Sequence, residues 1–232
     1  AALIALSLGA GLAGYGVVVE AGQTATPTPA STATQQANAT TAQNLPLDDQ
    51  ADFEDAERGL IARDPNLVIT DADGNTVWDM TAYDFIEGDA PDTVNPSLWR
   101  QAKLNDLHGL YKVTDRIYQL RGYDLSNMSL IEGDSGWIVV DPLTTAETAA
   151  AGWRMAKAHI LGDKPIVAVI FTHSHIDHFG GIEGVLSAEQ AQRDNVRLIA
   201  PKGFMQESTS ENLLAGPAMG RRATYMFGGA LA

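Results

Sequence analysis

Apolar and polar residues alternate along the chain in short runs that predict strands separated by turns. NLVITDADGNTVWDM predicts two short strands around a turn, and RIYQLRG, SNMSLIEG and GWIVVDP predict three more, the last two joined by EGDSG. Those three together predict an antiparallel meander. TTAETAAAGWRMAKAHILG then predicts an alanine-rich helix that ends in glycine, and KPIVAVIFT a short, mostly apolar strand. Strand, helix and strand in succession indicate a layered α/β domain.

Two helices are predicted before the meander. DDQADFEDAERGLIAR carries acids at its start and arginines towards its end, the charge order that a helix dipole favours. TVNPSLWRQAKLNDLHG predicts a helix with Asn95 as its cap and Pro96 at its first position. His108, at the end of that helix, is expected to be a capping or surface histidine. A calcium loop starting at Asp71 is rejected in favour of the hairpin, because its glycine and its twelfth residue fall at the wrong positions.

The first 47 residues differ in composition from the rest. Residues 1–22 form an apolar run without a charge before Glu20, which we interpret as signal-peptide-like, with a permanent membrane anchor as the alternative. The protein is therefore expected to be periplasmic or secreted. Residues 23–47 are rich in Thr, Ala and Gln and predict a disordered linker. The globular part is expected over residues 48–232.

Composition narrows the classes of partner and site. The chain has 29 acidic and 15 basic residues and a net charge of −14, which disfavours binding to nucleic acid or to anionic membranes. It has no cysteine, which excludes disulfides and thiolate metal sites. Any metal must be held by nitrogen and oxygen.

FTHSHIDHFGG, residues 171–181, places three of the five histidines within six positions. It follows a buried strand, at the edge where α/β sheets place their chemistry, and leads into GGIEGVLSAEQAQ, a predicted helix. Residues two apart on an extended chain point the same way, so His173 and His175 can share one cation, while Asp177 and His178 can face a second. Imidazole and carboxylate suit zinc, and two ions bridged by hydroxide would lie about 3.5–4 Å apart. Gly180 and Gly181 leave space for this crowded loop.

The loop, with its flanks, resembles a known family. THSHIDH after an apolar strand is similar to the His-x-His-x-Asp-His signature of the metallo-β-lactamase superfamily. GLYKVTDRIYQLRGYDLSNMSLIEGDSGWIVVDPLTTAETA and SENLLAGPAMGRRATYMFG resemble its zinc-dependent linear alkyl sulfatases, over about residues 48–229. The resemblance implies an αββα sandwich of which this chain is the N-terminal portion. It implies two zinc ions, hydrolysis of primary alkyl sulfates such as dodecyl sulfate, a homodimer, and these metal ligands: His173, His175, Asp177 and His178.

The resemblance also implies roles for two aspartates. Asp177 is expected to be catalytic, since it would both bind metal and orient the bridging hydroxide. Asp141 would support the site, although a plain strand terminator is an equal alternative. His159, alone on an alanine-rich helix, is expected to lie on the surface.

The chain departs from the family in its later residues. Family members complete the centre with downstream carboxylates and a histidine, but no histidine follows His178. We therefore expect a partial sequence that is inactive or poorly folded alone. The spacing selects none of the available carboxylates, which are Glu183, Glu189, Glu207 and Glu211.

Several residues and functions keep two interpretations. Arg221 and Arg222 could bind sulfate but are better explained as salt-bridge partners. Five apolar residues could line an alkyl groove but better fit a core: Leu213, Leu214, Met219, Met226 and Phe227. Two other functions stay open, another hydrolase of this fold (lactamase, thioesterase, lactonase or phosphodiesterase) and a non-catalytic zinc-binding module.

Overall fold

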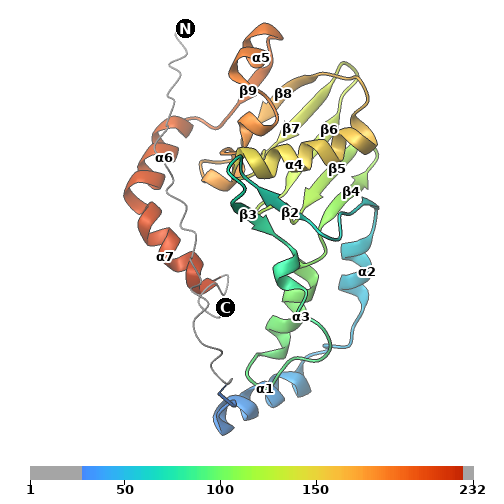
Figure 1. Ribbon diagram of the computed structural model, residues 1–232, viewed down its shortest axis with the longest axis vertical. Helices are drawn as coiled ribbons and strands as arrows, with labels where there is room; N and C mark the ends of the chain where they lie inside the picture. The colour runs from blue at the N-terminus through green and yellow to red at the C-terminus, as the bar shows by residue number, and fades with distance from the viewer. Residues whose placement is uncertain (1–27, 227–232) are drawn as a thin grey trace.

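The main sheet has seven strands and lies in the upper right of Figure 1, above helices α1 to α3. The structure, a computed structural model, describes residues 28–226, with side chains placed as far as residue 222. Neighbouring strands are antiparallel from β1 to β7, and β7, β8 and β9 are parallel. The α/β prediction and the antiparallel meander are confirmed. In spatial order the strands are β1 (Leu60–Ala62), β4 (Gly109–Thr114), β5 (Ile117–Arg121), β6 (Met128–Glu132), β7 (Trp137–Val140), β8 (Ile166–Ile170) and β9 (Arg197–Ile199).

The core lies between one face of this sheet and helix α4 (Ala146–Ala156), which continues as the π-helix η2 (Lys157–Leu161). Alternation along β7 turns Trp137 and Val139 inward, and both are fully buried. Gly152 lets α4 approach closely, since a Cβ there would lie 3.2 Å from Leu120 and Met128. The opposite face of the sheet is only partly buried, for example at Ile138.

A two-stranded hairpin, β2 (Val68–Thr70) and β3 (Thr76–Asp79), packs across α4. It confirms the predicted hairpin. The carboxylate of Asp71 accepts hydrogen bonds from the backbone N–H groups of Asp73 and Asn75, which close the turn. A short 3₁₀ turn, η1 (Thr81–Tyr83), follows.

Helix α3 (Pro96–Asn105) is capped by the Asn95 side chain, as predicted. The surface prediction for His108 is wrong, because only 6% of this residue is exposed. Its Nε2 lies 2.7 Å from the backbone oxygen of Asp64 and its Nδ1 lies 3.1 Å from that of Asp106. A neutral ring donates to one of these oxygens, which offsets part of the cost of its burial. His108 is thus a buried structural residue.

The segment predicted as a disordered linker contains a helix, α1 (Thr32–Asn44). Ser31 caps it, and the side chain of Asn38 donates to the backbone oxygen of Asp92, so α1 is fixed beside α3. These contacts are not visible in composition. The acidic segment after it forms a shorter helix than predicted, α2 (Ala51–Glu57), before the chain enters β1.

After β8 the chain makes short turns rather than the single helix predicted over residues 180–192. These are the 3₁₀ turns η3 (Ile176–His178) and η4 (Ile182–Gly184), then α5 (Ala188–Arg193). Beyond β9, α6 (Phe204–Ser210), the π-helix η5 (Glu211–Ala215) and α7 (Gly216–Met226) form one helical arm, residues 204–226, directed away from the sheet (Figure 1). No helix among residues 28–226 is long and apolar enough to cross a membrane. The apolar run of residues 1–22 lies outside the described residues.

Candidate metal centre

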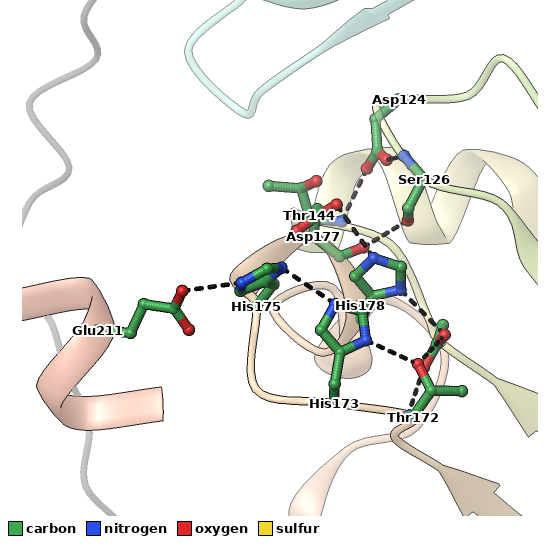
Figure 2. A network of polar contacts seen from close by, with 10 residues as sticks. Asp124, Ser126, Thr144, Thr172, His173, His175, Asp177, His178 and Glu211 are labelled. Atoms are coloured by element: carbon green, nitrogen blue, oxygen red, sulfur yellow. Dashed lines mark hydrogen bonds and ion pairs between the residues drawn. The ribbon is translucent and has the colours of Figure 1, made fainter. Parts of the chain in front are cut away.

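The histidine loop begins where β8 ends, as the sequence predicts. Its two glycines are required by close packing, because a Cβ at Gly180 would lie 2.2 Å from the Thr144 carbonyl oxygen and one at Gly181 would lie 2.3 Å from that of Pro142. The loop is thereby pressed against the start of α4. Its imidazoles collect on one side of the turn (Figure 2).

The first pair is His173 with His175, whose Nε2 and Nδ1 atoms lie 3.1 Å apart. The other nitrogen of each ring is occupied. His173 Nδ1 is 3.0 Å from the Thr172 hydroxyl, and His175 Nε2 is 2.8 Å from a carboxylate oxygen of Glu211. The Thr172 hydroxyl donates to Asp141, so it accepts the Nδ1 proton of His173. In neutral rings, these partners leave a lone pair on each of the two nitrogens that face each other.

The second pair is Asp177 with His178. His178 Nδ1 donates to Asp141 over 2.9 Å, and His178 Nε2 lies 3.2 Å from a carboxylate oxygen of Asp177. The donation from Nδ1 leaves a lone pair on Nε2 of the neutral ring. This lone pair faces the carboxylate of Asp177, so two hydrogen-bond acceptors, His178 Nε2 and an Asp177 oxygen, again lie next to each other.

Two hydrogen-bond acceptors at such distances repel each other unless a cation, either a proton or a metal ion, lies between them. Two ligands of one tetrahedral zinc ion, with bonds of about 2.0–2.1 Å, would lie roughly 3.3 Å apart. The two pairs of acceptors are spaced 3.1 and 3.2 Å apart. The nitrogen and oxygen atoms of the two pairs therefore suit a divalent cation as ligands, in both chemistry and spacing. They do so only as pairs, because no group of three or more His, Asp or Glu side chains among the described residues is arranged to hold a metal.

Asp141 lies at the base of the site, at the end of β7. Its carboxylate accepts from the backbone N–H and hydroxyl of Thr172, at 2.8 and 2.6 Å, as well as from His178. It adopts a positive φ of 53°, a conformation that aspartate tolerates better than most residues. Its side chain is only 10% exposed. Asp141 therefore supports the histidines rather than merely ending a strand.

A second buried carboxylate, Asp124, was not singled out from the sequence. It accepts from the backbone N–H groups of Ser126 and Thr144 and from the Thr148 hydroxyl. Burial raises its pKa, and these hydrogen bonds offset part of the rise. The Ser126 hydroxyl in turn donates to the backbone carbonyl of Asp177 (Figure 2). Asp124 thus fixes the loop that holds Asp177.

Among the four carboxylates that the sequence left open, the structure brings Glu211 to the site. Its carboxylate contacts His175, and Ser174 Oγ lies 3.5 Å from its second oxygen. The others, Glu183, Glu189 and Glu207, are exposed. Spacing gave no signal for Glu211, because the contact depends on how the arm leaves β9.

The remaining candidates form no hydrogen bond or ion pair with the imidazoles among the described side chains. His159 is exposed, as predicted. Arg221 and Arg222 are exposed and form no ion pair with another described side chain, so the salt-bridge interpretation is not supported. The core interpretation of Leu213, Leu214 and Met219 is wrong, since they are 70%, 83% and 43% exposed. The side chains of Met226 and Phe227 lie outside the described part.

Comparison with known proteins identifies relatives of the chain. Residues 121–224 match the model of the metallo-beta-lactamase superfamily. An (R)-specific secondary-alkylsulfatase of Pseudomonas sp. is 51% identical over 201 residues, which are 86% of this chain and 30% of that protein. A linear primary-alkylsulfatase of Pseudomonas sp. is 48% identical over 205 residues, 88% of this chain and 30% of that protein.

A solved structure supports the same relationship. The stereoselective inverting sec-alkylsulfatase Pisa1 from Pseudomonas sp. superimposes with a TM-score of 0.78 at 51% identity, over 85% of this chain and 31% of that one. This similarity confirms the predicted fold class. The chain spans about 30% of the length of the curated relatives that it matches. The histidine loop lies inside the residues that match the metallo-β-lactamase superfamily model, and about half of the positions aligned with these alkylsulfatases are identical.

Proposed function

We propose that this chain contributes to the catalytic unit of an alkyl sulfatase, which hydrolyses an alkyl sulfate ester to an alcohol and sulfate. The reaction is R–O–SO₃⁻ + H₂O → R–OH + SO₄²⁻ + H⁺. The observation that carries the proposal is the two acceptor pairs at the end of β8, in a chain about half identical to alkylsulfatases. Such pairs suit a site that binds cations and acts on an anionic ester.

We propose zinc as the cation, with two ions in the complete protein. His173 and His175 would hold one, and Asp177 and His178 the other. Bound there, the ions would supply positive charge for the sulfate group and an activated water at neutral pH. Their charge would also make the local field in the site attract an anionic substrate, which the chain's net charge of −14 by itself repels.

The chain's own side chains would orient this site. Asp141 holds His178 through Nδ1, which keeps Nε2 available as a ligand. Ser126 donates to the backbone carbonyl of Asp177, which restrains the backbone from which its carboxylate projects. Asp177 would therefore both bind a cation and accept a hydrogen bond from the attacking water.

An assay can decide whether the substrate is a primary or a secondary alkyl sulfate. We propose primary alkyl sulfates of the dodecyl sulfate type as substrates, but the identities to a secondary and to a primary alkylsulfatase are nearly equal. Both kinds of ester belong in the assay. Hydrolysis in ¹⁸O-labelled water would show which bond breaks, since label in the alcohol requires attack at carbon.

The test uses the complete protein with dodecyl sulfate, a secondary alkyl sulfate, nitrocefin and a lactone. We expect sulfate release that is abolished by a chelator, restored by zinc and lost in His173→Ala and His178→Ala. Hydrolysis of nitrocefin or the lactone alone would reassign the enzyme within the superfamily. A single closed metal site without hydrolysis would instead favour a zinc-binding module. The 232-residue chain by itself is expected to release no sulfate.

We also propose export and self-association for the complete protein. The apolar residues 1–22 suit a cleaved leader, and the resemblance to alkyl sulfatases implies a homodimer. Amino-terminal sequencing of the exported protein and light scattering would test the two. An uncleaved protein retained in the membrane, or a monomer, would contradict them.

A further inference from the structure

We propose that Glu211 is the positioning residue of His175. Its carboxylate accepts a hydrogen bond from His175 Nε2–H at 2.8 Å, which holds the neutral ring in one tautomer and orientation. The lone pair on Nδ1 then points towards His173 Nε2, 3.1 Å away. The role of Glu211 in holding the ring is independent of the proposed function. Only the statement that the Nδ1 lone pair would bind a metal ion rests on that function.

Comparison within the site supports this assignment. His173 and His178 each have a partner on the nitrogen that faces away from its pair, namely Thr172 and Asp141. Outer partners of this kind fix the tautomer and orientation of metal-binding histidines. Glu211 gives His175 the corresponding partner (Figure 2). The need is greatest here, since the side chain of His175 is 49% exposed and that of His178 only 23%.

The arm is built so that Glu211 reaches the loop. At its start, Phe204 stacks on Phe171 with ring centroids 5.5 Å apart and contacts Phe179 edge-on at 5.2 Å, so α6 is anchored to both ends of the histidine loop. Ser208, one turn further, is buried. The helix changes to a π-helix at Glu211, a distortion that is frequent at functional sites.

The proposal predicts different results for two substitutions at this position. Glu211→Gln retains an oxygen that can accept the hydrogen bond, whereas Glu211→Ala removes the acceptor. Glu207→Ala is the matched control, because Glu207 is an exposed carboxylate one turn earlier on the same arm. Glu211 itself is 32% exposed, so its loss is not expected to unfold the chain.

Two measurements on the complete protein test the proposal. The first is the ¹⁵N–¹H spectrum of the imidazoles without metal at about pH 8, above the ordinary pKa of histidine. We expect a single Nε2–H form of His175 in the wild type and in Glu211→Gln, and a mixture of both tautomers in Glu211→Ala. The second is zinc affinity by competition with a chelator, where Glu211→Ala should weaken binding about 10–100-fold. Glu211→Gln should lose less than Glu211→Ala, and Glu207→Ala should lose nothing.

The outcomes separate this proposal from the proposed function. A single His175 tautomer in Glu211→Ala, or an equal loss of zinc affinity in Glu207→Ala, would overturn the role of Glu211. If the wild-type complete protein bound no zinc, the proposed metal function would fail, while the imidazole spectrum, recorded without metal, would still decide whether Glu211 holds the ring. Unchanged backbone amide signals on β5 to β8 would confirm that the variants are folded.

Discussion

Replacing Asp124 with alanine removes one carboxylate that ties together two loops at the base of the site. Asp124 is 7% exposed. It accepts hydrogen bonds from Thr144 N–H at 2.7 Å, from Ser126 N–H at 3.0 Å and from the Thr148 hydroxyl at 2.7 Å. In Asp124→Ala, the two backbone N–H groups have no acceptor, while the Thr148 hydroxyl keeps the Thr145 carbonyl at 3.1 Å.

These contacts set the size of the effect. An unpaired buried N–H group costs about 1–3 kcal/mol, so two of them cost roughly 2–6 kcal/mol. Removal of the buried charge returns part of this, because burial raises the pKa of Asp124 and so disfavours its ionised form. We expect a net loss of about 2–4 kcal/mol for Asp124→Ala. Asp124→Asn keeps one acceptor oxygen and leaves one N–H group unpaired, so its loss should be about 1–2 kcal/mol.

Urea unfolding followed by tryptophan fluorescence measures the loss, since Trp137 lies buried in the core. At a slope of about 2 kcal/mol per molar, the midpoint of Asp124→Ala should fall by roughly 1–2 M. Asp134→Asn is the control, because this carboxylate pairs with Arg116 but is 96% exposed, and its removal should not shift the midpoint. An alanine variant as stable as the wild type, or less affected than the asparagine variant, would refute the account of Asp124.

Three further predictions concern the same region. In Asp141→Asn the backbone keeps its positive φ, but an amide N–H₂ group faces His178 Nδ1 and favours the tautomer with its proton on Nε2. Zinc affinity, measured by competition with a chelator, should therefore fall about 10–100-fold. An unchanged affinity would contradict this role of Asp141. Gly181→Ala places a Cβ 2.3 Å from a carbonyl oxygen and should cost about 1–3 kcal/mol in urea unfolding, whereas Gly216→Ala, on an open helical surface, should not destabilise the chain. Because the pKa of Asp124 is raised, the folded chain keeps the proton of this carboxyl group to a higher pH than the unfolded chain does. The contribution of Asp124 to the free energy of unfolding therefore falls as pH rises from about 3.9, the ordinary value, through the raised pKa. The stability difference between wild type and Asp124→Asn should therefore be larger at the acidic end of that range than at neutral pH, and a constant difference would refute this assignment.

Local sequence signals predicted the elements that carry the site. The period-two pattern of β5, β6 and β7 and the cap at Asn95 depend on neighbouring residues, so they can be identified without the fold. The position of the histidine loop after β8 was predicted for the same reason. The pairing of His173 with His175, and of Asp177 with His178, also follows from their spacing, although metal binding by these residues stays a prediction.

Features that depend on distant contacts were missed. Helix α1 has almost no apolar face and is held by a cap and by a hydrogen bond from Asn38 to a distant loop, so its composition resembles that of a linker. Strands β4 and β9 were also not predicted, and β9, whose residues are all exposed, is only three residues long. Asp124 and Glu211 reach the site only through the folding of the chain, and no residue near either one marks it as different from the other acids.

The three histidines are held by partners from three separate parts of the fold. Thr172 follows β8, Asp141 ends β7 and Glu211 begins η5 in the arm. The folded structure therefore orients the ring nitrogens before any cation binds, and little ordering entropy remains to oppose binding. Because linkage is reciprocal, a cation that prefers this arrangement must stabilise the contacts that create it by the same free energy. Metal binding should consequently tighten the attachment of the arm through Glu211 and His175, which makes the arm part of the site rather than an extension from the sheet.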